Sequence, residues 1–414
     1  MATTEARPRQ GVAAREPRGS GWESPVTSYY LIGVVTALLL VLGLVMVLSS
    51  STVLSTANEG SPYAIFIDQA VFAGVGLVAM AGASRLPVRV YKRIAWPVIL
   101  AALALQLLVF SPWGVEHGGN RAWVAVPGVP YTFQPSEFLK IALVVWLAAV
   151  LAAKGELLRE PKHVLVPAGL GACAALGLVA LGRDLGTVLI MVALTAGALW
   201  AARVPARLLA AAGALAAAAV VLMTVTSSNR MHRLQTFLGL VEADPQAGGY
   251  QAKHGLYGLG TGGISGVGLG ASREKWQYLP EAHNDFILAV IGEELGLLGT
   301  LLVLGLFGAL AVGLHRVASR NRDPFVKIAT GAAGAWIMVQ AIVNIGVVIG
   351  WVPVIGVPLP LLSQGGSALI TNLTVLGIVL AFARAEPGAA DAFAARRGAV
   401  RRSLAVVAGR RRRG

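Results

Sequence analysis

The sequence is poor in charged residues and has almost no cysteine. Only 13% of its 414 residues are Asp, Glu, Lys or Arg, while 56% are hydrophobic. Soluble domains carry roughly 25% charged residues, so this composition excludes an ordinary soluble protein and indicates an integral membrane protein. The single cysteine, Cys173, excludes an intrachain disulfide and gives no sign of a thiolate metal site. The six histidines lack metal-ligand spacing, which argues against a zinc hydrolase.

Acidic residues are scarce as well, with 20 Asp and Glu against 34 Lys and Arg and a net charge of +14. Most of the cations lie in short loops and tails beside apolar segments, where they orient membrane helices. No soluble region is large enough to read nucleic acid, so no nucleic-acid partner is expected. The first apolar run begins near Tyr29, behind a polar tail, and can span a bilayer, so a secretory signal peptide is not expected.

Long apolar runs dominate the rest of the chain. A transmembrane helix needs about 20 mostly apolar residues. The segments that meet this requirement are 29–50, 64–83, 94–111, 136–153, 163–182, 185–202, 206–226, 287–314, 325–351 and 366–384. We therefore predict an all-α polytopic membrane protein with about ten transmembrane helices. An alternative for the segment 287–314 is that it begins as an interfacial helix.

Lys and Arg gather on alternate sides of these segments, which predicts that both termini are cytoplasmic. Residues 29–384 then form one transmembrane domain. The flanking tails, 1–28 and 385–414, are basic, and we predict that they are disordered. The C-terminal tail either contacts anionic lipids or serves only as a positive-inside anchor. The largest loop on the opposite, extracytoplasmic side is 227–286, between the seventh and eighth helices.

The stretch YLPEAHNDFILAVIGEELG closes this loop and concentrates acids where an apolar run begins. Asp285 lies where the chain enters the apolar layer. A partly desolvated carboxylate has a raised pKa, which suits a general base. In the alternative interpretation, Pro280 and Glu281 begin a helix and Asp285 is an exposed acid in its first turn.

Other ionisable side chains lie at membrane depth, where such groups are costly and usually functional. Glu137 and Lys140 are three residues apart and share a helix face, so they either line a site or form a self-neutralising ion pair. Asp184 either faces the same site or caps the helix that follows it. Of Glu293 and Glu294, one is expected to face a cavity and the other to act as an interfacial cap.

The cations of the outer loops favour an anionic ligand. They are Arg121, Arg230, Arg233, Lys253, Arg273 and Lys275. A positive cavity with a few carboxylates suits the phosphates of a lipid headgroup, and ordinary solvation is the alternative for these cations. Mg²⁺ usually binds through one or two carboxylates plus substrate oxygens, so we expect Asp285 to share a divalent cation, Mg²⁺ or Mn²⁺, with a diphosphate.

These motifs resemble those of one family. YLPEAHNDFILAVIGEELG, preceded by GYQAKHGLYGLGTGGISGVGLG, is similar to the signature of the SEDS (shape, elongation, division and sporulation) proteins of the FtsW/RodA type. FQPSEFLK at 133–140, RDLGT at 183–187 and PVIGVPLPLLSQGGS at 353–367 occur in the family's order. The resemblance covers the chain from about Tyr29 to Arg384. Within the family, EAHNDFILAVIGEELG is closer to the division-type, FtsW-like pattern than to the elongation type.

The resemblance implies a fold of ten transmembrane helices and a peptidoglycan glycosyltransferase that polymerises lipid II. Its motifs make Asp285 the essential carboxylate, supported by a divalent metal, and match Glu137, Lys140 and Asp184 to further motif residues. The implied partners are a class B penicillin-binding protein and other division or elongation proteins of the membrane. Substrate binding is assigned to Glu137, Lys140, Asp184, Arg121, Lys253, Glu281, His283 and Ser363.

A mechanism follows as an expectation. Asp285 accepts the proton of the acceptor GlcNAc 4-hydroxyl, which attacks C1 of the donor MurNAc and inverts it in one displacement. One base is then sufficient, whereas glycosidases use two carboxylates. The enzyme is expected in the cytoplasmic membrane with its site on the extracytoplasmic face. Two alternatives remain open: a lipid II flippase or transporter, which should also have ionisable groups through the inner half of its spans, and a non-catalytic division scaffold, which would not need Asp285.

Overall fold

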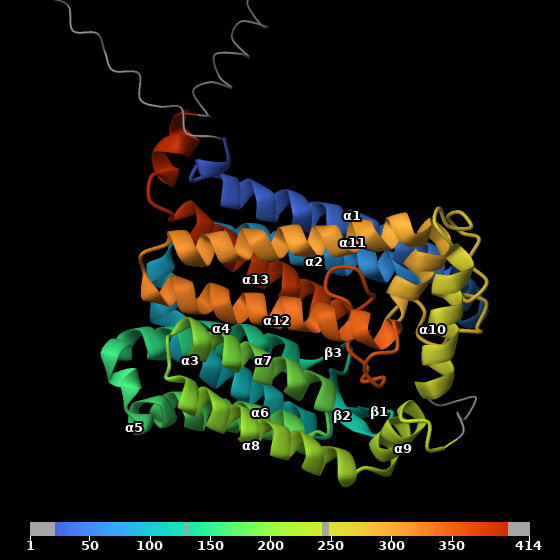
Figure 1. Ribbon diagram of the computed structural model, residues 1–414, viewed down its shortest axis with the longest axis horizontal. Helices are drawn as coiled ribbons and strands as arrows, with labels where there is room; N and C mark the ends of the chain where they lie inside the picture. The colour runs from blue at the N-terminus through green and yellow to red at the C-terminus, as the bar shows by residue number, and fades with distance from the viewer. Residues whose placement is uncertain (1–20, 129–130, 242–247, 396–414) are drawn as a thin grey trace, which may run out of the picture.

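The computed structural model describes residues 21–128, 131–241 and 248–395. The chain forms a bundle of long helices whose axes run along one direction, with both described ends at one end of the bundle (Figure 1). The long helices are α1 (Thr27–Glu59), α2 (Ala64–Arg85), α3 (Val88–Leu107), α4 (Pro135–Lys154), α6 (Leu170–Leu181), α7 (Leu185–Ala201), α8 (Ala206–Val225), α11 (Ile287–Arg320), α12 (Pro324–Val348) and α13 (Gly366–Arg384).

These helices match the ten predicted spans one to one. Within the described residues, nine helical segments are long and apolar enough to cross a membrane, and α7, with 17 residues, is a shorter apolar helix. The span predicted at 163–182 consists of the one-turn helix α5 (Pro161–Val164), a π-helical stretch and α6. The prediction of an all-α polytopic membrane protein is therefore confirmed.

A small antiparallel sheet between α3 and α4 was not predicted. Its strands, paired in chain order, are β1 (Gly114–His117), β2 (Asn120–Ala125) and β3 (Thr132–Phe133). Gly118 and Gly119, both at positive φ, form the tight turn between β1 and β2. The backbone N–H of Arg121 donates to the Gly182 carbonyl at 2.9 Å. The sheet is thereby fixed to the turn between α6 and α7.

Helix α11 is interrupted at Gly296, whose backbone lies in the left-handed region at φ 68°. The loop of residues 263–269 fills the interruption and pairs with the backbone groups that it leaves free. Its hydrogen bonds to α11, donor first, are Val267 to Glu293, Gly268 to Glu294, Leu297 to Gly263 and Leu298 to Ile264, all 2.9–3.2 Å long. A break that would leave buried polar groups unpaired is thus satisfied by another part of the chain.

Two further helices, α9 (Ser228–Phe237) and α10 (Gly248–Gly262), lie in the large loop at the other end of the bundle from the described chain ends (Figure 1). Glycines allow α10 to approach the first part of α11 very closely. A Cβ atom on Gly262 would lie 1.9 Å from the Gly292 carbonyl oxygen, and one on Gly258 would lie 3.3 Å from that of Ala289. The part of the outer loop that contains α10 is therefore packed closely on the bundle.

The core lies among α4, α12 and α13, where Trp146, Trp336 and Phe382 are almost fully buried. Helix α8 is the opposite case, because it contains no buried residue. Its apolar side chains are suited to contact with lipid, since a helix at the edge of a membrane bundle needs no core of its own.

The inner ends of both tails make specific contacts with α11. The guanidinium of Arg316 donates to the Trp22 carbonyl at 2.7 Å and lies over the Trp22 ring, and Arg320 donates to the Glu23 carbonyl. Arg320 also pairs with Glu386 at 3.4 Å. The inner ends of both tails thus contact α11, and the predicted domain boundaries at 28 and 385 stay predictions. The predictions for 1–20 and 396–414 lie outside the described residues.

Candidate active site

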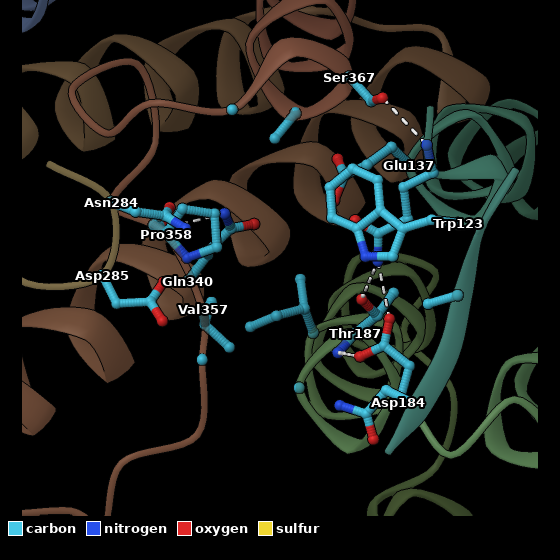
Figure 2. Close-up of a pocket in the computed structure, with 18 of the residues that line it drawn as sticks. Trp123, Glu137, Asp184, Thr187, Asn284, Asp285, Gln340, Val357, Pro358 and Ser367 are labelled. Carbon is cyan, nitrogen blue, oxygen red and sulfur yellow. Dashed lines mark hydrogen bonds between the residues drawn. The ribbon is translucent and has the colours of Figure 1, made fainter. Parts of the chain in front are cut away.

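A cavity of about 850 Å³, counting its open mouth, lies at the end of the bundle that carries the large loop. Figure 2 shows two walls that face each other, with Asp285 and Asn284 on one and Glu137, Asp184 and Trp123 on the other. The lining comes from the small sheet, α4, α7, α12, the start of α13 and the chain segments just before α11 and α13. The site is therefore assembled from segments far apart in the sequence.

The wall formed by α4 carries a closed ion pair. The Lys140 ammonium lies 2.8 Å from the Glu137 carboxylate and 4.5 Å from the centre of the Trp336 ring, and both charged side chains are buried. The second Glu137 oxygen accepts a hydrogen bond from the Thr371 hydroxyl at 2.9 Å. The pair is self-neutralising, as one interpretation of the sequence held, and both residues also line the cavity. Burial without a partner would be very costly for either charge.

Asp184 also fulfils both interpretations of the sequence. One of its oxygens accepts from the backbone N–H of Thr187 at 3.0 Å and caps α7, while the other accepts from the Gln134 amide at 2.7 Å. The residue lines the cavity at the same time. Burial raises the pKa of Asp184, and the hydrogen bonds with Thr187 oppose that rise.

Asp285 lies in a stretch whose backbone is held rigidly. Three successive carbonyls accept hydrogen bonds: that of His283 from the Gln364 N–H at 3.0 Å, that of Asn284 from the Ser363 hydroxyl at 2.6 Å, and that of Asp285 from the Asn344 amide at 2.8 Å. The helix begins only at Ile287, so the interpretation of Asp285 as an exposed acid in a first helical turn is wrong.

Of the acids that line the cavity, Asp285 has the fewest hydrogen-bond partners at its carboxylate. Among the described residues, no hydrogen bond to its side-chain oxygens is found. Burial raises the pKa of Asp285 to about 7; the negative charge of Glu281 adds to the rise and the positive charge of Arg233 opposes it. A carboxylate with a pKa near neutrality and free lone pairs is suited to accept a proton from a bound hydroxyl.

Five of the predicted substrate-binding residues do not line the cavity. The Arg121 guanidinium donates a hydrogen bond to the Ser111 carbonyl at 2.9 Å and so braces the small sheet. Ser363 holds the Asn284 carbonyl, and the carboxylate of Glu281 accepts from the Asn284 amide. His283 contributes its backbone carbonyl, and Lys253 is exposed on α10 with its ammonium 5.7 Å from the Tyr257 ring. Three of the five thus lie against the Asp285 segment itself.

Several lining residues were not predicted. They are His117, Asn120, Trp123, Gln134, Thr187, Asn284, Gln340 and Ser367, among others. The position of Gln134, directly before the Pro-Ser-Glu motif, was a signal that could have been used. Arg233 was one of six equivalent loop cations in the sequence. Only the fold shows that its charge reaches Asp285.

Glu293 and Glu294 have a structural role. Both are buried. Glu293 accepts from the Ser272 hydroxyl at 2.5 Å and from the Arg273 N–H at 2.9 Å, while Glu294 accepts from the Ser49 hydroxyl at 2.7 Å. The expectation that one faces a cavity and the other caps an interface is therefore wrong. Their carboxylates instead hold the end of the long loop against α11.

The residues present do not form a resident metal site. Within the described parts of the chain, no group of three or more His, Cys, Asp or Glu side chains could hold a metal ion. Glu137 and Asp184 are occupied by Lys140 and by the α7 cap, which leaves Asp285 as the one lining carboxylate with free oxygens. This donor set fits only an ion that arrives with substrate phosphates, as Mg²⁺ commonly does.

Comparison with known proteins then decides the family. The family model for cell cycle proteins of the FtsW, RodA and SpoVE type matches residues 29–387. The chain belongs to this family. The family assignment predicted from the motifs is therefore confirmed, over nearly the range from which it was drawn.

Curated relatives of the family cover most of the chain. A probable peptidoglycan glycosyltransferase FtsW of Mycobacterium tuberculosis is 40% identical over 389 residues, which are 94% of this chain and 74% of the relative. The protein of the same description from Trichlorobacter lovleyi is 36% identical over 82% of this chain and 88% of the relative.

Solved structures show the same fold. A chain in a peptidoglycan synthase complex that coordinates polymerization and crosslinking superposes with a TM-score of 0.69 at 27% identity, covering 86% of this chain and 97% of that one. The crystal structure of the rod shape determining protein RodA of Thermus thermophilus gives a TM-score of 0.63 at 26% identity, with 86% and 96% covered.

Proposed function

We propose that this member of the family is a peptidoglycan glycosyltransferase that polymerises lipid II. The family assignment and the glycosyltransferase relatives support the class of reaction. The observation that carries the mechanism is the unpartnered Asp285 carboxylate, whose pKa is raised to about 7, on the wall of the cavity. It faces the wall that carries Glu137, Asp184 and Thr187 (Figure 2), across a cavity of about 850 Å³ including its open mouth.

In this mechanism Asp285 is the general base. It accepts the proton of the acceptor GlcNAc 4-hydroxyl while that oxygen attacks C1 of the donor MurNAc, and the C1–oxygen bond to the diphosphate breaks. Inversion at C1 in a single displacement requires one base, which agrees with the other two lining acids being occupied by partners in the structure. Those partners keep Glu137 and Asp184 fixed, so they are suited to orient sugar hydroxyls.

The leaving diphosphate needs positive charge. Lys140 is already balanced by Glu137, and Lys253 is exposed on α10 away from the cavity lining. Arg233 does not line the cavity either, but its positive charge lowers the pKa of Asp285, so we assign it the diphosphate in place of Lys253. Asp285 would be the residue that holds a divalent cation, Mg²⁺ or Mn²⁺, and when bound this ion would supply positive charge to neutralise the phosphates.

We further propose that the protein works in the cytoplasmic membrane with its site on the extracytoplasmic face. The short loops rich in Lys and Arg lie at the end of the bundle opposite the cavity, which supports this orientation. A class B penicillin-binding protein is the proposed partner, since the similar solved chain belongs to a complex that joins polymerization to crosslinking. The curated relatives of FtsW description favour a role in division over one in elongation, alongside other division proteins.

The test is lipid II polymerisation by the purified protein, with a class B penicillin-binding protein and Mg²⁺, comparing wild type with Asp285→Asn and Asp285→Ala. We expect both variants to bind lipid II and to lose at least about 100-fold in rate, the usual lower range for a general base. The matched control is Glu116→Gln, an exposed acid near the cavity mouth that does not line it; its rate should equal that of wild type.

Either of two results would contradict the proposal. Polymerisation by Asp285→Asn at the wild-type rate would show that Asp285 is not the base. An inert wild-type protein, with metal and partner present, would favour the flippase or scaffold interpretation.

A further inference from the structure

The long loop contains a stretch that is unusual for a loop facing water. From Leu256 to Ser272 there is no Asp, Glu, Lys or Arg. The large apolar side chains of this stretch are nevertheless exposed, with Ile264 at 72% and Leu269 at 61%. A contiguous exposed apolar patch on a folded element marks an interaction surface. The residues concerned are Leu256, Tyr257, Ile264, Val267 and Leu269.

Backbone polar groups of this stretch are paired with backbone groups of α11. The loop 263–269 pairs with both sides of the break in α11, through the N–H groups of Val267 and Gly268 and the carbonyls of Gly263 and Ile264. In hydrocarbon each unpaired backbone group costs several kcal/mol, so irregular backbone is tolerated at membrane depth only where such pairing exists. This pairing makes the loop compatible with immersion in hydrocarbon.

The position of the loop along α11 gives its depth. About 20 residues cross the hydrocarbon core, and that many separate Arg316, which binds the Trp22 carbonyl at the opposite end, from the break at Gly296. The loop is therefore level with one boundary of the hydrocarbon core. Just past the break, Leu297 and Leu298 are exposed on α11. The apolar surface of the loop thus continues the lipid-facing surface of a spanning helix.

The neighbouring elements fit the same boundary. Figure 1 shows α10 crosswise to the long helices, as a helix lying in the plane of the membrane would be. After the loop come exposed Arg273, Trp276 and Tyr278. These residue types concentrate at the headgroup level of membranes. Lys275, the remaining cation of this segment, is buried and donates to the Gly270 carbonyl, so it adds no exposed charge.

From these observations we infer that the loop 263–269 and the end of α10 that precedes it, from Leu256 on, are immersed in the membrane leaflet next to the cavity, in contact with lipid acyl chains, while the exposed Lys253 ammonium stays at the headgroup level. This surface goes beyond the transmembrane helices and is independent of the glycosyltransferase mechanism. Because Ser272 and Arg273 bind Glu293 a few residues after Asp285, the immersed loop would hold the catalytic segment at the depth of a lipid headgroup.

Spin-label accessibility tests this inference directly. Cys173 is the single cysteine, so a Cys173→Ser background allows one nitroxide at a time. Labels are placed by Ile264→Cys and Leu269→Cys in the full chain, reconstituted in vesicles of phosphatidylethanolamine and phosphatidylglycerol. Collision rates are measured with oxygen, which concentrates in lipid, and with nickel ethylenediaminediacetate, which stays in water. Two exposed positions avoid dependence on one variant that fails to fold.

The reference positions are Leu301→Cys on the exposed face of α11 and Glu116→Cys on β1, near the same end of the bundle. We expect the oxygen-to-nickel ratio at residues 264 and 269 to be several-fold above that at 116 and close to that at 301. A ratio equal to that at 116 would overturn the inference, because the loop would face water. Low collision rates with both reagents would also overturn it, because a second copy of the protein would then cover the loop.

Discussion

Three acids line the cavity, and their surroundings separate their roles. Glu137 is neutralised by Lys140 at 2.8 Å, and Asp184 is used by the first turn of α7 and by Gln134. Asp285 alone keeps a carboxylate without a hydrogen-bond donor among the described side chains. Its reactivity is therefore set by burial and by two nearby charges of opposite sign, Glu281 and Arg233.

Removal of each of these two charges should shift the pH–rate profile, in opposite directions. In the proposed mechanism Asp285 acts only when deprotonated, so the rate should rise as the pH passes the pKa of Asp285, about 7, and level off above it. Glu281→Gln removes a charge that raises this pKa, so its profile should move to lower pH. Arg233→Gln removes a charge that lowers it, so its profile should move to higher pH.

The measurement is kcat/KM for lipid II polymerisation against pH, at one fixed Mg²⁺ concentration. Glu116→Gln serves as the control and should keep the wild-type midpoint. Shifts of the same sign in Glu281→Gln and Arg233→Gln would show that their charges do not act on the catalytic carboxylate.

At the level of elements, the site depends on hydrogen bonds between segments that are far apart in the sequence. The chain before α13 holds the carbonyls of His283 and Asn284, while Asn344 of α12 binds the carbonyls of both Asp285 and Val357. The loop 263–269 closes the break in α11. A helix with a left-handed residue in its middle is stable only because this second segment satisfies it.

Gly296 should therefore tolerate no side chain. Gly296→Ala would place a Cβ 2.5 Å from the Ile264 carbonyl oxygen, at a φ of 68° that L-residues rarely adopt. We expect a loss of at least about 1–3 kcal/mol in stability, seen as a lower Tm of the purified protein in detergent. The matched control is Gly305→Ala in the same helix, where an added Cβ would meet no atom within 4 Å outside the adjoining backbone of the helix itself.

Gly305→Ala should raise the stability slightly, by about 0.5–1 kcal/mol, because alanine favours the helix. Equal Tm values for the two variants would show that the break in α11 is not fixed by the loop.

For the whole molecule, the arrangement of ends and loops predicts a sidedness. Both described ends of the chain and the short α5 lie at one end of the bundle, and the small sheet, α9 and α10 lie at the other (Figure 1). The short loops rich in Lys and Arg belong to the first end, whereas the cations at the other end lie mostly in the one long loop. Positive loops remain in the cytoplasm, so the cavity should open to the outside of the cell.

Cysteine labelling in intact cells tests this orientation. In the Cys173→Ser background, we expect a membrane-impermeant maleimide to label Glu116→Cys on β1 in intact spheroplasts. Arg159→Cys, which is exposed before α5, should be labelled only after the membrane is opened. Labelling of Arg159→Cys alone in intact spheroplasts would mean that the protein has the reverse orientation.

Much of the architecture could be read from the sequence, because the length of an apolar run and the charge beside it are local properties. The ten spans and the family follow from such runs and from contiguous motifs. The motif residues Glu137, Lys140, Asp184 and Asp285 do meet in one cavity. The break in α11 and the small sheet were not predicted, because a single left-handed glycine and strands of two to six residues leave little periodic signal.

The sequence by itself thus determined the class of protein, its membrane helices and the acids that could carry chemistry. Only the tertiary structure decided which acid is free, because the partners that occupy the others come from distant segments, as Thr371 binds Glu137 from 234 residues away. It also decided which loop cation reaches Asp285, and that Arg121 and Ser363 brace the site without lining it. The physical reason is that charge and hydrogen bonding act through space, over distances that the order of residues does not contain.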